Sequence, residues 1–449
     1  MGRLFGTDGI RGIAGEDLSA KRALAVGEAI GRVLSEDYRH KVKIALATDT
    51  RISSGMLEAA MLAGLRSSGA DTVSLGVAPT PAVAFLTVKN GLDAGVVISA
   101  SHNPYEYNGI KIFGKDGFKI PDEIEKSIED LVLESSENYR RRDGNFGNEI
   151  EVKYRTEDYQ NHITENGCNL KGMRIGIDCA NGATAETAQK IFPALGAECH
   201  FIGCSPNGKN INEKCGSTST ESLKNLVKEK RLHLGIAFDG DGDRCLAVDE
   251  KGNEVDGDYI MAILAKSLKM KSKLYKNGVV GTVMTNLGFI KFCESERINY
   301  YSSKVGDRYV LELMEQESLS FGGEQSGHII LRELATTGDG QLTAAVLLSV
   351  IKESGKSLSS LSSVMKKYPQ YQLSVKASEK DKIALKIDPI ICEHISETEK
   401  LLSDGRLVVR PSGTEPLIRI MAEGEREEFI KKAVEDLAQK INSRLEELK

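Results

Sequence analysis

The chain repeats one pattern of hydrophobic and polar positions three times. In each repeat a short, apolar, β-rich run ends in a polar or glycine-containing loop, which leads into a segment with helical periodicity. The runs begin at Lys43, Met173 and Gly278, so 130 and 105 residues separate successive starts. This repetition predicts three α/β units of similar design.

The end of the chain has a different pattern. Between residues 425 and 449 the apolar positions predict one face of a helix that closes a smaller last domain. These positions are Phe429, Ala433, Leu437, Ile441, Leu445 and Leu448. Polar stretches at 134–148, 249–253 and 366–369 predict the junctions between units. We therefore expect domains at 1–150, 151–252, 253–366 and 367–449.

Composition narrows the class of protein. The chain has 449 residues, of which 40% are apolar and 28% charged, so we expect a folded protein and not a disordered tail or a membrane protein. The net charge is −6 and the basic residues are spread along the chain, which argues against a general nucleic-acid binder. The eight cysteines form no Cys-x-x-Cys pair and the N-terminus lacks the apolar core of a signal peptide. These features predict reduced thiols and a cytoplasmic protein.

Three carboxylates alternate with glycines directly after an apolar run that ends at residue 238. Asp239, Asp241 and Asp243 can converge only if a cation offsets their repulsion, and hard oxygen ligands suit Mg²⁺. An EF-hand is one alternative because Glu250 completes its spacing, but Arg244 stands where that loop requires glycine, and both flanks favour strands. A solvated acidic turn is the other alternative. We predict a divalent-metal site that leaves coordination positions open for a substrate or phosphate oxygen.

A second candidate loop follows the apolar strand pattern at 96–98 and contains Ser101, His102 and Pro104. Pro104 prevents the loop from becoming helix, so we expect it to hold a hydroxyl in the open. Ser101 is a candidate nucleophile with His102 as a nearby proton acceptor, although neighbours in sequence need not face each other. A turn capped by serine and asparagine is the structural alternative.

Two later loops carry polar groups that suit a phosphorylated sugar. The segment 321–328 brings Glu324, Ser326 and His328 together with three glycines, which gives neighbouring donors and acceptors for hydroxyls; a plain hairpin loop is the alternative. The segment 407–420 forms a candidate anion cradle from arginines, hydroxyls and free backbone amides; a structural turn is the alternative. Its residues are Arg410, Ser412, Gly413, Thr414 and Arg419.

Along the chain, the serine loop comes first, followed by the three-aspartate loop with Arg244, the segment 321–328 and the segment 407–420. These four motifs, in that order, resemble those of the α-D-phosphohexomutase superfamily, one per expected domain, and the resemblance covers essentially the whole chain. The segments 3–12, 322–328 and 410–419 are most similar to its amino-sugar branch. Phosphomannomutase and phosphoglucomutase relatives commonly have methionine at the position of Gln325. The resemblance implies a heart-shaped α/β architecture with three similar α/β domains, a smaller α+β C-terminal domain and a central active-site cleft.

The resemblance also implies residue roles. Ser101 would carry the phosphoryl group and, with the three aspartates, hold one Mg²⁺ per chain. Arg11, Lys111 and Arg244 would surround the phosphoserine, with Lys111 as general acid/base. From the residues alone, a surface charge is the favoured interpretation of both Arg11 and Lys111. His328 would lie near the transferred group. Two further sets are Glu324 and Ser326 for the sugar, and Arg410, Ser412, Gly413, Thr414 and Arg419 for the distal phosphate.

The implied reaction interconverts glucosamine 6-phosphate and glucosamine 1-phosphate, towards UDP-N-acetylglucosamine. It would pass through phosphoserine and a 1,6-bisphosphate, with a sugar 1,6-bisphosphate as activator. The expected partner is a hexosamine phosphate, with no nucleic acid or membrane, and the expected assembly is a monomer or homodimer. The alternatives are a phosphomannomutase/phosphoglucomutase, a phosphatase that passes the group to water, and a non-catalytic sugar-phosphate sensor.

One position departs from the superfamily pattern. Ala47 stands where the strand before Asp49 and Arg51 often ends in glycine in relatives. We therefore expect a weaker role for Arg51.

Overall fold

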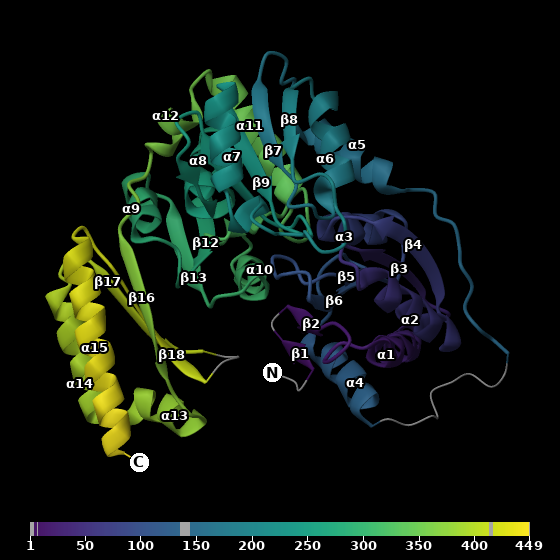
Figure 1. Ribbon diagram of the computed structural model, residues 1–449, viewed down its shortest axis with the longest axis horizontal. Coiled ribbons are helices and arrows are strands. Elements are labelled where there is room, and N and C mark those ends of the chain that lie inside the picture. The colour runs from purple at the N-terminus through teal and green to yellow at the C-terminus, as the bar shows by residue number, and fades with distance from the viewer. Residues whose placement is uncertain (1–3, 7, 135–143, 413–415, 449) are drawn as a thin grey trace. The chain divides into compact units, whose positions relative to one another are not determined.

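The computed structural model describes residues 4–6, 8–134, 144–412 and 416–448. The chain divides into two compact units. The first unit comprises Met1–Thr282 with Tyr301–Val364, and the second comprises Val283–Tyr300 with Met365–Lys449. Figure 1 labels the helices and strands of both.

The first sheet of the first unit orders its strands β1-β2-β6-β5-β3-β4. The strand β3 lies parallel to β4 and β5, whereas β6 is antiparallel to β5. Helix α1 packs against both α2 and α4 beside this sheet, around one apolar core. The strands are β1 (Phe5–Gly6), β2 (Gly9–Ile13), β3 (Lys43–Thr48), β4 (Asp71–Val77), β5 (Ala94–Ile98) and β6 (Tyr107–Gly114). The helices are α1 (Ala20–Tyr38), α2 (Ser54–Ser67), α3 (Thr80–Lys89) and α4 (Asp122–Leu133).

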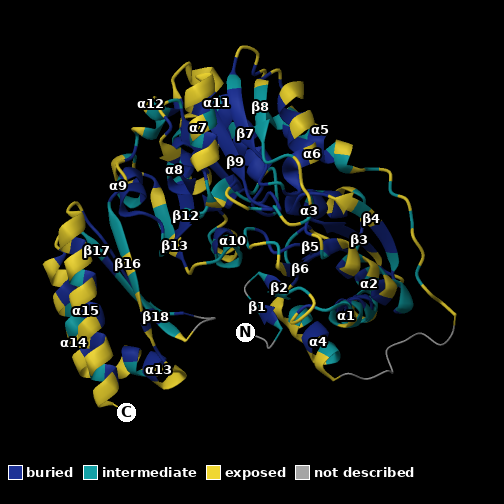
Figure 2. Cartoon of the chain, viewed as in Figure 1, coloured by how far each residue is buried: buried dark blue, intermediate teal, exposed yellow. Residues whose placement is uncertain are grey.

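The second sheet orders its strands β11-β10-β9-β7-β8, with β7 parallel to β8 and β9. Figure 2 shows β7 and β9 buried, whereas α7 has an exposed outer face. The strands are β7 (Arg174–Asp178), β8 (Glu198–Ile202), β9 (Leu234–Phe238), β10 (Cys245–Asp249) and β11 (Glu254–Val255). The helices are α5 (Thr156–Asn166), α6 (Thr184–Ala194) and α7 (Glu221–Lys230). The polar stretch 249–253 is the hairpin turn between β10 and β11, in which Asp249 accepts hydrogen bonds from the amides of Lys251 and Asn253.

The third sheet orders its strands β13-β12-β14-β15. They are β12 (Gly278–Thr282), β13 (Asn299–Ser303), β14 (Phe321–Gly323) and β15 (Ile329–Leu331). The helices of this part of the chain are α8 (Gly257–Met270), α9 (Leu287–Ser295), α10 (Asp307–Gln316), α11 (Gly340–Ser354) and α12 (Leu358–Ser362). The predicted repeat is confirmed, since its three apolar runs form β3, β7 and β12.

The second unit contains an antiparallel sheet in the order β16-β18-β17. Its strands are β16 (Gln370–Lys376), β17 (Arg406–Pro411) and β18 (Leu417–Glu423), and its helices include α13 (Glu379–Ile387), α14 (Pro389–Leu401) and α15 (Glu427–Glu447). No helix among the described residues is both long and apolar enough to cross a membrane.

The predicted C-terminal helix is α15, but part of its predicted buried face is wrong. Phe429 is 37% exposed and Leu448 is 47% exposed, whereas Ile430 and Val434 are buried. An α-helix has 3.6 residues per turn, so positions spaced four residues apart rotate gradually around it. The first and last predicted positions therefore lie outside the buried face.

Candidate active site

Ser101 lies just beyond the C-terminal end of β5, in a loop that turns back towards β6. Its φ of 52° is in the left-handed region, which a residue with a Cβ rarely adopts. The expectation of an open hydroxyl is wrong, because Ser101 is 1% exposed and its Oγ donates to Asp239 Oδ2 at 2.6 Å. The loop is covered by segments distant in sequence, which the local pattern does not encode.

His102 lies beside this hydroxyl but does not receive its proton. His102 Nδ1 is 3.4 Å from Ser101 Oγ, which is the long side of a hydrogen bond. Burial, with the positive charges of Arg244 and Arg11, lowers the pKa of His102 to about 4. The ring is therefore neutral at physiological pH, and Asp239 is the acceptor that holds the serine.

The three aspartates converge as predicted, on the loop between β9 and β10. One carboxylate oxygen from each of Asp239, Asp241 and Asp243 lies within 4.8 Å of the others. Burial, together with the charges of Asp243 and Asp241, raises the pKa of Asp239 well above its ordinary value. Among the described residues no hydrogen bond reaches Asp241 Oδ1 or Asp243 Oδ1, although both atoms are buried. Crowded, buried carboxylate oxygens without donors fit a bound divalent cation.

The structure excludes the EF-hand alternative. The segments on both sides of the loop are the antiparallel strands β9 and β10, not helices. Glu250, which that motif would need as a ligand, accepts hydrogen bonds from the amide and hydroxyl of Ser359 instead. The buried carboxylates also exclude a solvated acidic turn.

Lys111, on β6, reaches into this cluster. Its Nζ lies 2.9 Å from Asp241 Oδ2, 3.1 Å from Asp243 Oδ2 and 3.2 Å from Asp8 Oδ2, and the residue is 2% exposed. Burial alone would lower the pKa of Lys111, but the three carboxylates outweigh it and raise the pKa well above its ordinary value. The side chain is therefore an ammonium at neutral pH, and the surface-charge alternative is wrong.

Two arginines complete the positive side of the cluster. Arg11 pairs with Asp8, and the Arg244 amide donates to Asp239 Oδ1 at 3.1 Å. The Nε atoms of both arginines are buried and have no hydrogen-bond partner among the described residues. Buried donors without partners are unfavourable unless a ligand accepts from them, and phosphoryl oxygens are suitable acceptors.

The segment 321–328 comprises β14 and the hairpin turn that leads to its antiparallel partner β15, and it also carries the predicted polar groups. Glu324 Oε1 accepts from the Gly306 amide at 3.0 Å, while burial raises the pKa of Glu324. Ser326 Oγ is buried without a partner in the described chain. His328 connects this turn to the three-aspartate loop (Asp239, Asp241 and Asp243), since its Nδ1 is 3.7 Å from Asp243 Oδ1. The structure thus brings the segment 321–328 next to the three-aspartate loop.

The fourth motif belongs to the second unit. Arg410 on β17 and Arg419 on β18 are register partners, so two cations face each other across adjacent strands. Burial and the charge of Arg419 lower the pKa of Arg410. The Ser412 amide donates to the Leu417 carbonyl at 2.8 Å, whereas Gly413 and Thr414 lie outside the described residues. Neighbouring like charges of this kind are typical of an anion site.

Sequence reasoning missed an ionic network beside Lys111. Asp8 accepts from Lys119 Nζ at 2.5 Å, and the same Nζ lies 2.5 Å from Asp307 Oδ2. Despite burial, Lys111, Lys119 and Arg11 hold the pKa of Asp8 well below its usual range. The available signal was the position of Asp8 and Arg11 in one glycine-rich segment.

Sequence reasoning also underestimated Arg51, whose side chain is fully buried and bonded to the serine loop. Ala47, the position that departs from the superfamily pattern, is a buried residue of β3. The available signal was topological: Arg51 follows β3 and Ser101 follows the parallel neighbour β5, so both lie at the same edge of the sheet.

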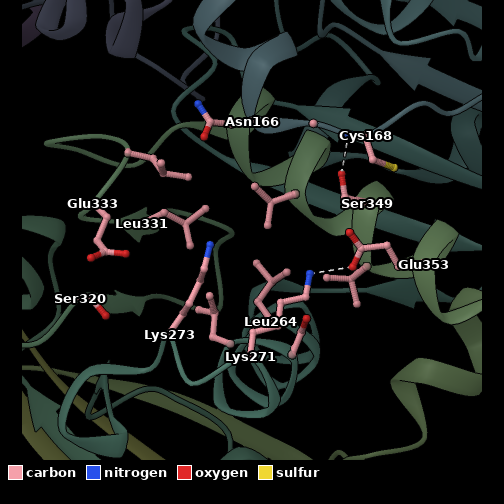
Figure 3. Close-up of a pocket in the computed structure, with 16 residues that line it drawn as sticks. Asn166, Cys168, Leu264, Lys271, Lys273, Ser320, Leu331, Glu333, Ser349 and Glu353 are labelled. Atoms are coloured by element: carbon pink, nitrogen blue, oxygen red, sulfur yellow. Dashed lines mark hydrogen bonds and ion pairs between the residues drawn. The ribbon is translucent and has the colours of Figure 1, made fainter.

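A separate pocket of about 230 Å³ lies between α8, α11 and β15 (Figure 3). Apolar side chains such as Leu264 and Leu331 line it, and Lys271 at its rim pairs with Glu353 at 2.6 Å. The predicted site residues are not among those that line it.

Comparison with known proteins agrees with this geometry. The chain matches the family models of phosphoglucomutase/phosphomannomutase α/β/α domains I, II and III at residues 2–139, 157–252 and 256–368, and that of the C-terminal domain at 373–440. A phosphoglucosamine mutase from Acetivibrio thermocellus is 50% identical over 449 residues, covering 99% of this chain and 100% of the relative.

Two solved structures share the fold. A phosphoglucomutase/phosphomannomutase family protein from Burkholderia thailandensis has a TM-score of 0.82 at 21% identity, covering 98% of this chain and 97% of that one. The N-acetylphosphoglucosamine mutase of Aspergillus fumigatus, solved with GlcNAc-6P and magnesium, has a TM-score of 0.70 at 16% identity, covering 98% and 95%. With four domain models and a full-length relative at this identity, the chain belongs to the phosphoglucosamine mutases, isomerases of the phosphohexomutase superfamily with a four-domain α/β architecture.

Proposed function

We propose that this protein interconverts glucosamine 6-phosphate and glucosamine 1-phosphate by passing a phosphoryl group through Ser101. The observation that carries the proposal is the hydrogen bond from the buried Ser101 Oγ to Asp239 Oδ2 at 2.6 Å, inside the three-aspartate cluster. A hydroxyl held against a cation site, with arginines and a lysine around it, suits phosphoryl transfer. The name of the full-length relative supports the amino sugar as substrate.

We propose that Asp239, Asp241 and Asp243, with phosphorylated Ser101, hold one Mg²⁺. The buried carboxylate oxygens without hydrogen-bond donors support this choice. When bound, the ion supplies positive charge that offsets the negative charge of the phosphoryl oxygens.

The remaining residues are assigned by their chemistry. Arg11 and Arg244 offer buried Nε–H groups to the phosphoryl oxygens. Lys111 is our candidate general acid/base, and its raised pKa means that it begins as the acid, able to protonate the serine oxygen as the phosphoryl group leaves. His328 supports the three-aspartate loop through Asp243 and lies near the transferred group.

We propose that the segment 321–328 binds the sugar and that the segment 407–420 binds its second phosphate. Glu324 and Ser326 would hydrogen-bond the sugar hydroxyls, because the Ser326 hydroxyl is buried without a partner in the described chain. The distal phosphate would be bound by Arg410, Ser412, Gly413, Thr414 and Arg419. A 1,6-bisphosphate formed in the first transfer would then return its other phosphoryl group to Ser101, and added sugar 1,6-bisphosphate would act as activator. We retain 1–150, 151–252, 253–366 and 367–449 as the proposed domain limits.

The test is conversion of glucosamine, glucose and mannose 6-phosphates to their 1-phosphates, with Mg²⁺ and catalytic sugar 1,6-bisphosphate. We expect the amino sugar to be preferred and Ser101→Ala to abolish turnover. The matched control is Ser74→Ala, which removes a surface hydroxyl bonded to Glu58. Preference for glucose or mannose would contradict the substrate assignment, and full activity of Ser101→Ala would contradict the mechanism.

A further inference from the structure

The backbone of the Ser101 loop is gathered by one buried guanidinium. Arg51 Nη2 donates to the carbonyl oxygens of Ser101 at 3.0 Å and Asn103 at 2.9 Å. Its Nη1 donates to the Tyr107 carbonyl at 3.0 Å and also to that of Pro104. One side chain therefore ties together both ends of the loop.

A second donor reaches the same two carbonyls from another part of the chain. Asn212 Nδ2 donates to the oxygens of Ser101 at 2.9 Å and Asn103 at 3.1 Å. Asn212 lies in the segment between β8 and α7, where its own amide donates to the Ala180 carbonyl at 2.9 Å. Each of the two carbonyls thus accepts from Arg51 and from Asn212.

The guanidinium is itself fixed. Arg51 Nε donates to Asp49 Oδ2 at 2.8 Å, and both side chains are fully buried. Ser99 Oγ donates to the same Asp49 oxygen at 2.6 Å and accepts from the Ser101 amide at 3.0 Å. The Arg51–Asp49 pair is therefore connected to the Ser101 amide, through Ser99, as well as to the Ser101 carbonyl.

This arrangement is more than stability requires. A buried ion pair is often no better for stability than apolar packing, because desolvating two charges offsets much of their attraction. Here the guanidinium donors other than Nε end on loop carbonyls, around a serine with a φ of 52°. Left-handed backbone at a residue with a Cβ persists only when its surroundings impose it, and such strain clusters at functional sites.

We propose that Arg51 and Asn212 form a clamp on the Ser101 and Asn103 carbonyls that positions Ser101 Oγ for phosphoryl transfer. Both are positioning residues, because they act through the loop backbone. The inference rests on the proposed function, since the positioned atom is the one proposed to carry the phosphoryl group.

The test compares Asn212→Ala, Arg51→Lys and the double variant with two controls. Asn210→Ala removes a half-buried side-chain amide two residues away, which donates to the Ser205 carbonyl and accepts from the Asn207 amide. Arg66→Lys alters a part-exposed arginine of α2. We expect kcat to fall by about 10²-fold in each clamp variant, the scale of a 1 Å misplacement, with KM for the sugar phosphate unchanged. Because both donors hold the same carbonyls, the double variant should lose less than the product of the single losses.

Wild-type kcat in Asn212→Ala, a rise in KM that accounts for the loss, or single effects that multiply would each overturn the clamp. If Arg51→Lys fails to fold, Asn212→Ala decides the question alone. Hydrogen exchange of residues 101–107 separates this inference from the proposed function, because it needs no turnover. Faster exchange there in Asn212→Ala than in Asn210→Ala supports the clamp even in an enzyme inactive on hexosamine phosphate, and equal exchange overturns it.

Discussion

Replacing Lys111 with methionine removes a buried charge from the centre of the site and keeps a side chain of similar length. The ammonium lies 2.9–3.2 Å from oxygens of Asp241, Asp243 and Asp8, and Lys111 itself is only 2% exposed. Methionine leaves these carboxylates without that cation. The substitution therefore tests both the architecture of the cluster and the part that Lys111 plays in it.

The size of the effect follows from burial. Removing one partner of a buried ion pair costs about 3–5 kcal/mol, which in a domain of a few hundred residues lowers the thermal midpoint by about 5–10 °C. This drop is expected in EDTA. Mg²⁺ should reverse part of it, since a ligand that binds the folded state at 100 times its Kd adds about 2.7 kcal/mol.

Lys111 also competes with the metal for charge. Its Nζ is bonded to the Oδ2 atoms of Asp241 and Asp243, so its loss leaves these carboxylates more attractive to a divalent cation. Removing a like charge within a few ångströms of the ion is worth at least about 1.4 kcal/mol, a factor of ten in Kd. We expect Lys111→Met to bind Mg²⁺ about tenfold more tightly than the wild type and to lose nearly all turnover.

The assay is a thermal melt in EDTA and across a Mg²⁺ titration, with turnover measured on the same samples. The matched control is Lys126→Met, which removes a largely exposed lysine paired with Asp130 on α4 and should shift the midpoint very little. A wild-type midpoint in EDTA or weaker Mg²⁺ binding would refute the placement of Lys111 among the carboxylates. Normal turnover would refute its role as general acid/base.

Three further predictions address other parts of the molecule. In Gly240→Ala the new Cβ would lie 2.5 Å from the Ser101 carbonyl oxygen. We therefore expect kcat to fall at least about tenfold and the free energy of unfolding to fall by about 1–3 kcal/mol. Wild-type turnover would contradict this contact. Burial raises the pKa of Asp339 to about 6, so protonation stabilises the folded state by up to about 3 kcal/mol below pH ~4, and this contribution is lost as the pH rises to about 6. The thermal midpoint of Asp339→Asn relative to wild type should therefore rise between about pH 4 and about pH 7, and a constant difference would show that Asp339 has an ordinary pKa. In Glu423→Ala the second unit loses a fully buried carboxylate that accepts from Arg406 Nε at 3.0 Å. We therefore expect faster amide hydrogen exchange in β16, β17 and β18. Protection equal to that of the wild type would show that this ion pair contributes little to the stability of the sheet.

The strand–loop–helix units could be predicted from sequence because buried parallel strands consist of unbroken runs of apolar residues. Every residue of β5 is buried, and the run ends just before Ser101. The three-aspartate loop could also be predicted from sequence, since Asp239, Asp241 and Asp243 are separated only by glycines and local backbone geometry turns them towards one site. Chemistry carried by a few consecutive residues can be found without the fold.

The rest of the site depends on which strand ends meet, and periodicity does not encode that. Asn212 lies 111 residues from Ser101, and Asp307 lies 188 residues from Lys119. The same cause explains why an open Ser101 hydroxyl was expected: Asp239, which accepts from it, comes from a different sheet. Sequence reasoning underestimated Arg51 for a related reason. Its guanidinium donates to backbone carbonyls, and every residue has a carbonyl, so no residue type in the loop indicates the contact.

In the proposed reaction, Ser101 carries a phosphoryl group and passes it to a sugar phosphate. The most direct measurement is a single-turnover transfer from protein labelled with radioactive phosphate at Ser101, mixed with glucosamine 6-phosphate and Mg²⁺. We expect the label to leave the protein and to appear in the sugar 1,6-bisphosphate and sugar monophosphates. Label released only as inorganic phosphate, or retained on Ser101, would contradict the proposed reaction.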